Sequence, residues 1–151
     1  MQTEKAKYLL TFNEPELAEQ ANMTPLHAAE LWPDVIAIAN QYNLEVVAPC
    51  GTVDKGFSWY TQWIDECNAL YPETGCAFDY TCTHTYYQPA PCEGVPGWAC
   101  VSDVMNRINS WYNTFGKPVW VTEFACNPWE GDCDAEKQAA LMQQIIPVSP
   151  F

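Results

Sequence analysis

The chain has 151 residues, of which 19 are acidic and 6 are basic, giving a formal net charge of −13. This length supports one ordinary hydrophobic core, and no linker, low-complexity tract or membrane-spanning segment interrupts it. A surface this acidic offers little to nucleic acid or to an anionic membrane, so a neutral or cationic ligand is expected. The sequence therefore predicts one structural unit over residues 1–151 that binds neither nucleic acid nor membrane.

Strand-forming runs at residues 7–12, 44–49, 78–85 and 118–124 recur about every 35 to 40 residues, the period of a βα unit. The first helical pattern opens at Thr24-Pro25 and extends toward Asn40, although Pro33 should kink or split it. Three further helices are predicted: Trp59 to Leu70 with Ser58 as cap, one from Ser102 or Asp103 to Gly116, and one from Asp134 through Ile146.

This order predicts an α/β fold in which parallel strands are joined by right-handed crossovers. Four βα units are half of an eight-stranded (β/α)8 barrel of the TIM type, which typically takes about 250 residues. A half-barrel leaves strand edges and an inner face unpaired, so we expect either that a segment is missing or that two copies self-associate.

Eight cysteines are more than an ordinary cytosolic domain carries, and none of their spacings is Cys-x-x-Cys. Disulfides and secretion are therefore expected. Three pairs each bracket a short loop rich in Pro, Gly or Asp, and elimination leaves a fourth: Cys67–Cys76, Cys92–Cys100, Cys126–Cys133 and Cys50–Cys82. Because Gln2 to Lys7 is polar and holds no signal peptide, we expect that a leader was removed or that the gene product is longer.

Two glutamates end strand-forming runs, Glu14 in LLTFNEP (residues 9–15) and Glu123 in VWVTEF (residues 119–124). In an α/β barrel the C-terminal ends of the strands carry the catalytic groups. Cleavage of a glycosidic bond with retention needs two carboxyl groups, about 5 to 5.5 Å apart, as acid/base and nucleophile. Asn13, directly before Glu14, adds an amide that could hydrogen-bond a sugar hydroxyl. The pair therefore predicts a retaining glycosidase site.

Further candidates follow the third strand and flank the loops. His84 and Tyr86 share one strand face; Tyr86 could orient the nucleophile, while His84 is either a site residue or a satisfied core histidine. Trp59 and Trp129 are candidates for stacking on sugar rings, with partial core burial as the alternative. The sequence holds two histidines and no Gly-x-Ser-x-Gly elbow, so no metal site, cofactor or serine hydrolase is predicted.

These segments together resemble a known family: LxFNEP at 10–15, AELW at 29–32, HxYY at 84–87 and KPVWVTEF at 117–124. The chain is similar to glycoside hydrolase family 128, the fungal and bacterial endo-β-1,3-glucanases, from about Tyr8 to Ile146. The resemblance implies strand four to helix seven of a retaining (β/α)8 barrel, with Glu14 as acid/base and Glu123 as nucleophile. It implies β-1,3-glucan as substrate and a secreted or cell-wall location.

Three hypotheses remain open at this point. The first is a glycoside hydrolase, or an inactive piece of one, that acts on β-1,3-glucan by double displacement. The second is a non-catalytic β-glucan-binding or cell-wall protein that keeps an aromatic cleft. The third is a small disulfide-bonded α/β protein whose glutamates are ordinary loop residues, which requires both motifs to be coincidence.

Overall fold

The structure is a computed structural model, and it describes residues 6–52, 55–87, 101–126 and 134–146. These residues form four strands and five helices in the alternating order that the sequence predicts. The elements are β1 (Tyr8–Leu10), α1 (Pro25–Glu30), α2 (Trp32–Tyr42), β2 (Glu45–Gly51), α3 (Gly56–Leu70), β3 (Tyr80–Tyr87), α4 (Val101–Phe115), β4 (Val119–Cys126) and α5 (Ala135–Ile145).

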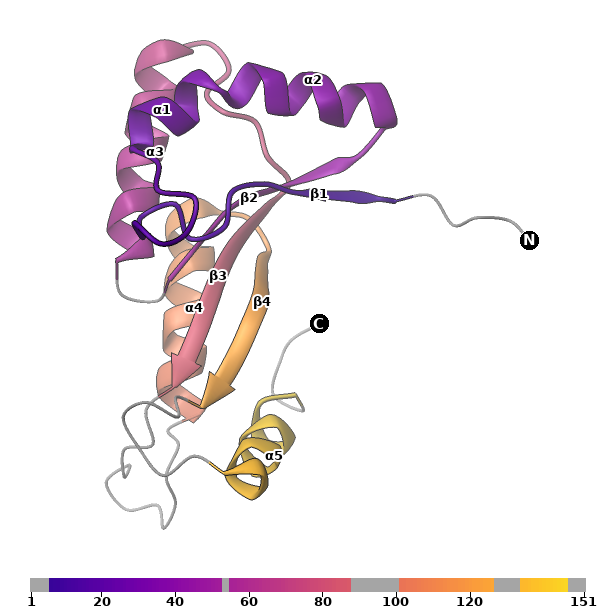
Figure 1. Cartoon of the computed structure of the whole chain (residues 1–151), viewed down its shortest axis with the longest axis vertical. Coiled ribbons are helices and arrows are strands. Elements are labelled where there is room, and N and C mark those ends of the chain that lie inside the picture. The colour runs from indigo at the N-terminus through magenta and orange to yellow at the C-terminus, as the bar shows by residue number, and fades with distance from the viewer. Residues whose placement is uncertain (1–5, 53–54, 88–100, 127–133, 147–151) are drawn as a thin grey trace, which may run out of the picture.

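The strands make one parallel sheet in the order β1-β2-β3-β4, so each strand pairs with its neighbour in sequence. Figure 1 shows helices α3 and α4 along one side of this sheet, with α1 and α2 above β2. Four parallel strands with alternating helices are a half-barrel, which confirms the predicted fold class. The register shifts twice, between Val47 and Cys50 on β2 and between Thr83 and His84 on β3.

Local signals explain most of the helix boundaries. The Thr24 hydroxyl accepts a hydrogen bond from the backbone N–H of His27 at 3.2 Å, which caps α1. Pro33 splits the predicted first helix into α1 and α2, as expected. Asp134 caps α5 in the same way, through the N–H of Lys137 at 2.8 Å.

The expected start of α3 is wrong. Ser58 does not cap this helix, which begins at Gly56 with Lys55 at the N-cap position and no side-chain cap bond. The reason is tertiary: Gly51 and Gly56 touch, and a Cβ added to Gly56 would lie 2.6 Å from the Cα and carbonyl carbon of Gly51. Two glycines are needed here because only bare backbone lets the end of β2 approach the first turn of α3.

The main core lies between the sheet and the helices, and large aromatic side chains dominate it. Trp32, Trp63 and Trp111 are at most 2% exposed, and Tyr60 is fully buried among them. The ring of Tyr60 packs edge-on against Trp63 at 5.0 Å and against Trp111 at 5.0 Å between centroids. This cluster holds α3 and α4 against the sheet.

Two of the expected disulfides are confirmed. Cys50–Cys82 joins β2 to β3, and Cys67–Cys76 joins the last turns of α3 to the loop that follows. The predicted pairs Cys92–Cys100 and Cys126–Cys133 include residues outside the described ranges. None of the described helices is long and apolar enough to span a bilayer.

Candidate active site

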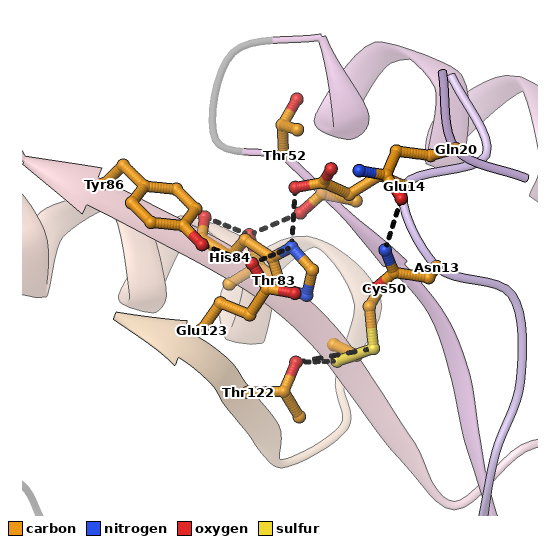
Figure 2. A network of polar contacts seen from close by, with 12 residues as sticks. Asn13, Glu14, Gln20, Cys50, Thr52, Thr83, His84, Tyr86, Thr122 and Glu123 are labelled. Atoms are coloured by element: carbon orange, nitrogen blue, oxygen red, sulfur yellow. Dashed lines mark hydrogen bonds and ion pairs between the residues drawn. A yellow bond between two sulfur atoms is a disulfide. The ribbon is translucent and has the colours of Figure 1, made fainter. Parts of the chain in front are cut away.

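Four of the predicted site residues meet at the C-terminal ends of the strands. Glu14 follows β1, His84 and Tyr86 lie on β3, and Glu123 lies on β4. Figure 2 shows the two carboxylates, the imidazole and the phenol pointing toward one another. Residues far apart in sequence converge here because parallel strands place all their C-terminal ends at one edge of the sheet.

His84 lies between the two carboxylates. Its Nδ1 atom is 2.7 Å from Glu14 Oε1 and 3.5 Å from Glu123 Oε2. The residue is 1% exposed, so it is both a buried histidine with a polar partner and a member of the site. A single proton on Nδ1 can be donated to only one carboxylate at a time, and the shorter distance favours Glu14.

Tyr86 donates a short hydrogen bond from its phenol to Oε2 of Glu123. This bond raises the pKa of the Tyr86 phenol to about 12, with burial and the nearby negative charges as further causes. The phenol therefore stays protonated, and remains a donor, over the whole physiological pH range. The contact holds the Glu123 carboxylate in a defined orientation on the open side of the site.

The backbone of Glu14 takes a conformation that side chains rarely adopt, with φ of +40°. Hydrogen bonds on both sides of the residue hold it there: its N–H donates to the carbonyl of Cys50 at 2.7 Å, and its carbonyl accepts from Leu17 at 3.0 Å. Such backbone strain costs on the order of 1–3 kcal/mol and persists only where surrounding contacts enforce it. The chain thus accepts a local cost that turns the Glu14 side chain toward His84.

Glu16 supports the same loop, and the sequence did not single it out. Its Oε1 atom accepts a hydrogen bond of 2.5 Å from the backbone N–H of Thr52, in the turn after β2. Glu16 Oε1 also lies next to Gly56, where an added Cβ would come within 3.0 Å of it. The loop that carries Glu14 is therefore tied to the start of α3.

The remaining predicted residues have different placements. The Asn13 side chain is exposed, and its amide donates a hydrogen bond to Gln20 Oε1 at 3.2 Å. Both residues lie in the loop after β1, beside the site. Trp59 does not present an open ring face: it is 7% exposed, belongs to the main core and donates its indole N–H to the carbonyl of Met23. It is buried because it shares the face of α3 that carries Trp63 and Cys67, spaced four residues apart, and this face packs into the main core. Trp129 lies outside the described residues.

The two carboxyl groups share one site but differ in environment. One carboxylate oxygen from each of Glu14 and Glu123 and one ring nitrogen of His84 all lie within 4.8 Å of one another. The side chain of Glu14 is 9% exposed, whereas that of Glu123 is 38% exposed. Among the described residues this is the cluster that could ligate a metal ion, but it contains one imidazole, whose Nδ1 is hydrogen-bonded to Glu14, and Glu123 Oε2 already accepts from Tyr86.

Beneath the carboxylates lies Thr122, another residue that sequence reasoning missed. Its hydroxyl is 3.2 Å from Cys82 Sγ and 3.7 Å from Cys50 Sγ. Because both sulfurs are bonded to each other, only the hydroxyl can be the donor. The one sequence signal for this arrangement is its place directly before Glu123, which puts Thr122 on the strand that carries the second carboxylate.

A half-barrel of parallel βα units with two carboxyl groups at its C-terminal edge defines a class, the α/β-barrel glycosidases. The comparisons with known proteins agree with this class. The family described as the glycosyl hydrolase catalytic core matches residues 1–149. The chain belongs to this family, as a partial catalytic core of the glycoside hydrolase family 128 type.

Solved structures show how much of that core is present. An endo-β-1,3-glucanase from Sorangium cellulosum is 28% identical with a TM-score of 0.76, over 97% of this chain and 56% of its own. One from Amycolatopsis mediterranei, in complex with laminaritriose, is 26% identical with a TM-score of 0.73, over 92% of this chain and 54% of its own.

A curated protein, alkali-sensitive linkage protein 1 of Schizosaccharomyces pombe, is 27% identical over 134 residues. The match covers 81% of this chain and 20% of that protein. The chain thus spans about half the length of the solved relatives and a fifth of the curated one.

Proposed function

We propose that this chain carries the acid/base and the nucleophile of a retaining β-1,3-glucan hydrolase. The observation that supports this most directly is the convergence of Glu14 and Glu123 on His84, with one atom of each within 4.8 Å of the others. Retaining glycosidases hold their two carboxyl groups about 5 to 5.5 Å apart. The substrate class comes from the relatives, which are named as endo-β-1,3-glucanases.

In this proposal Glu14 donates its proton to the glycosidic oxygen while Glu123 attacks the anomeric carbon. The bond to the leaving sugar breaks, and a glycosyl ester of Glu123 forms. Glu14, now ionised, then removes a proton from a water molecule that attacks the same carbon and releases Glu123. One water is consumed for each bond cleaved, and both carboxyl groups return to their starting states.

The surroundings of the two groups support this division of roles. Glu14 is the more enclosed carboxyl group and contacts the imidazole of His84, while Glu123 is more open and accepts from Tyr86. Carboxyl groups in unlike environments are what a division into acid and nucleophile requires. Asn13, at the edge of the site, is proposed to contact a sugar hydroxyl.

Reducing-end release from laminarin tests the proposal, with Glu123→Gln and Glu14→Gln as variants. Each should lower kcat by roughly a thousandfold or more, as removal of a directly reacting group does. Glu45→Gln is the matched control, because Glu45 also accepts from a tyrosine, Tyr80, but at the opposite end of the sheet. Parent activity that survives in Glu123→Gln would sink the assignment.

A second candidate function rests on the length of the match. Because the chain spans about half of the solved relatives, it could bind β-glucan without cleaving it. Pull-down on insoluble β-glucan with no sugar released supports that alternative. Absence of both binding and cleavage contradicts both candidates.

We also propose that the chain pairs with a second polypeptide, in the simplest case another copy of itself. Within the described residues, β1 and β4 each pair with one strand only, and Leu10 of β1 is 48% exposed. Unpaired strand edges favour association. Light scattering should show a dimer or larger species, and a monomer with a sharp cooperative melt would contradict the proposal.

The location proposed for the protein is outside the cell, in the wall or the medium. Cys50–Cys82 and Cys67–Cys76 support this, since disulfides persist mainly in oxidising compartments. Mass mapping of peptides from the native source, digested without reductant, tests it. Recovery of these cysteines as thiols would contradict it.

A further inference from the structure

The Cys50–Cys82 disulfide lies directly under the candidate active site. It links two residues that are already register partners on neighbouring strands, with their Cα atoms 4.4 Å apart. Cys50 is 5% exposed and Cys82 is fully buried. Figure 2 shows the sulfurs beneath the carboxylates, with the Thr122 hydroxyl on them.

Each strand that supplies a site residue is connected to this disulfide. The carbonyl of Cys50 accepts a hydrogen bond from the N–H of Glu14 at 2.7 Å, and the backbone of Cys50 also forms an isolated parallel β-bridge with Asn13. Cys82 precedes His84 by two residues on β3, so the two side chains point to the same face. The Thr122 hydroxyl contacts both sulfurs, and Thr122 directly precedes Glu123.

The sheet ladder is irregular at this level. The β2–β3 register shifts between Val47 and Cys50, and the β3–β4 register shifts between Thr83 and His84. A regular ladder fixes the relative placement of neighbouring strands through evenly spaced hydrogen bonds, and a bulge interrupts that constraint while re-aiming side chains. Between the two register shifts, the Cys50–Cys82 disulfide fixes β2 relative to β3 by a covalent bond.

The second disulfide offers a close comparison. Cys67 is 1% exposed and Cys76 is 5% exposed, so this pair is as buried as the inner one. It joins α3 to the loop after it and belongs to the main core, away from the carboxylates. The two disulfides therefore match in burial and differ in whether they contact the site.

We infer that Cys50–Cys82 is a positioning element of the active site, one that sets the distances among Glu14, His84 and Glu123. The inference rests on the proposed function, since it assigns the disulfide a role in the same site. Its contribution to the reaction is geometric: both cysteines are buried, and the backbone and the Thr122 hydroxyl transmit the effect of the disulfide to the reacting groups. A misplacement of about 1 Å at such groups can cost on the order of a hundredfold in rate.

Nitrogen NMR of the imidazoles tests the inference without requiring activity. The chain has two histidines, and a His27→Gln background leaves only the His84 signals. The double variant C50A/C82A should shift the His84 ring signals, because Nδ1 loses its set distances to the carboxylates. The matched control C67A/C76A should leave them unchanged. Parent-like His84 signals in folded C50A/C82A would overturn the inference.

Kinetics on laminarin add a readout that a purely structural disulfide would not move. At a temperature where both double variants are folded, C50A/C82A should lose about 10- to 100-fold in kcat with little change in KM. C67A/C76A should keep the parent kcat, and equal kcat values in the two variants would overturn the inference. If the parent itself releases no sugar, the proposed function fails, and the His84 signals still decide the role of the disulfide.

A further variant covers the case in which C50A/C82A does not fold. Thr122→Val keeps both disulfides and removes only the hydroxyl that connects the sulfurs to β4. It should shift the His84 ring signals in a folded protein. Unchanged signals in Thr122→Val would overturn the inference.

Discussion

The two faces of the sheet differ in the side chains that cover them. The face toward the helices is filled by large aromatic rings such as Trp63 and Trp111, which are fully or almost fully buried and each contact the ring of Tyr60 edge-on. The other face carries the carboxylate network at one end and a partly buried aromatic group at the other, Tyr8, Tyr80 and Trp120. The first face stabilises the fold by burying apolar side chains, whereas the geometry of the site on the second face depends on the placement of a few polar atoms.

This contrast explains how the chain uses its aromatic residues. Aromatic side chains make up 14% of the sequence, a composition that also suits sugar binding. The buried tryptophans serve the core instead, including Trp59, whose ring was a candidate sugar platform. A high aromatic content is therefore weak evidence for a carbohydrate site until the helix-facing core has been accounted for.

The largest expected effect breaks the helix-facing side. Trp63→Ala should lower the free energy of unfolding by about 3–5 kcal/mol, since it removes a fully buried indole. Trp120→Ala, on the partly buried inner cluster, should cost clearly less. Urea denaturation measures both, with exposed Tyr112→Ala as the control. Equal losses for the two tryptophans would show that the faces are equally covered.

An intermediate loss of stability is expected at the contact between the end of β2 and the start of α3. Gly56→Ala would place a Cβ 2.6 Å from Gly51 backbone atoms, so the turn must move. We expect a loss of about 1–3 kcal/mol, the usual cost of overpacking. The shift should also disturb the Thr52 to Glu16 hydrogen bond nearby.

Ser58→Ala is the matched control on the same helix. Ser58 is exposed and is not the N-cap, so its loss should stay well under the roughly 1 kcal/mol of a missing cap. Urea denaturation of both variants gives the comparison. A Ser58→Ala loss as large as that of Gly56→Ala would contradict the packing explanation.

The fold could be predicted from sequence because its signals are local. Apolar runs gave the four strands, and Thr24, Pro33 and Asp134 marked helix boundaries where the structure has them. The start of α3 could not be predicted, because it depends on the contact between Gly51 and Gly56. Ser58 has the residue type of a helix cap, but packing between Gly51 and Gly56 sets the start of the helix, and the sequence pattern does not reveal that contact.

The candidate site divides in the same way. Glu14, His84, Tyr86 and Glu123 could be placed together because parallel strands align their ends. Glu16 and Thr122 were missed, since each acts through a partner at least 36 positions away: the Thr52 N–H for Glu16 and the disulfide sulfurs for Thr122. Apart from the place of Thr122 directly before Glu123, nothing in the sequence around either residue signals such a partner.

The smallest expected effect sharpens the comparison within the inner face itself. Tyr86 donates to Glu123 at one end and Tyr80 donates to Glu45 at the other, and these bonds raise the pKa of each phenol to about 12. The pKa of each phenol in the folded protein lies above the ordinary tyrosine value of about 10, so both bonds stabilise the fold below pH 10. That contribution is lost as the pH rises from about 10 toward 12.

Phenolate absorbance during an alkaline titration measures this directly. Tyr86→Phe and Tyr80→Phe should each remove one late-titrating phenol from the eight tyrosines of the parent. Glu123→Gln should move one phenol to lower pH and leave the Tyr80 transition in place, because it removes the negative acceptor of Tyr86 alone. If Glu123→Gln leaves the whole curve as in the parent, the Tyr86 phenol is not governed by Glu123. The orientation of the Glu123 carboxylate, the proposed nucleophile, would then have no support from Tyr86.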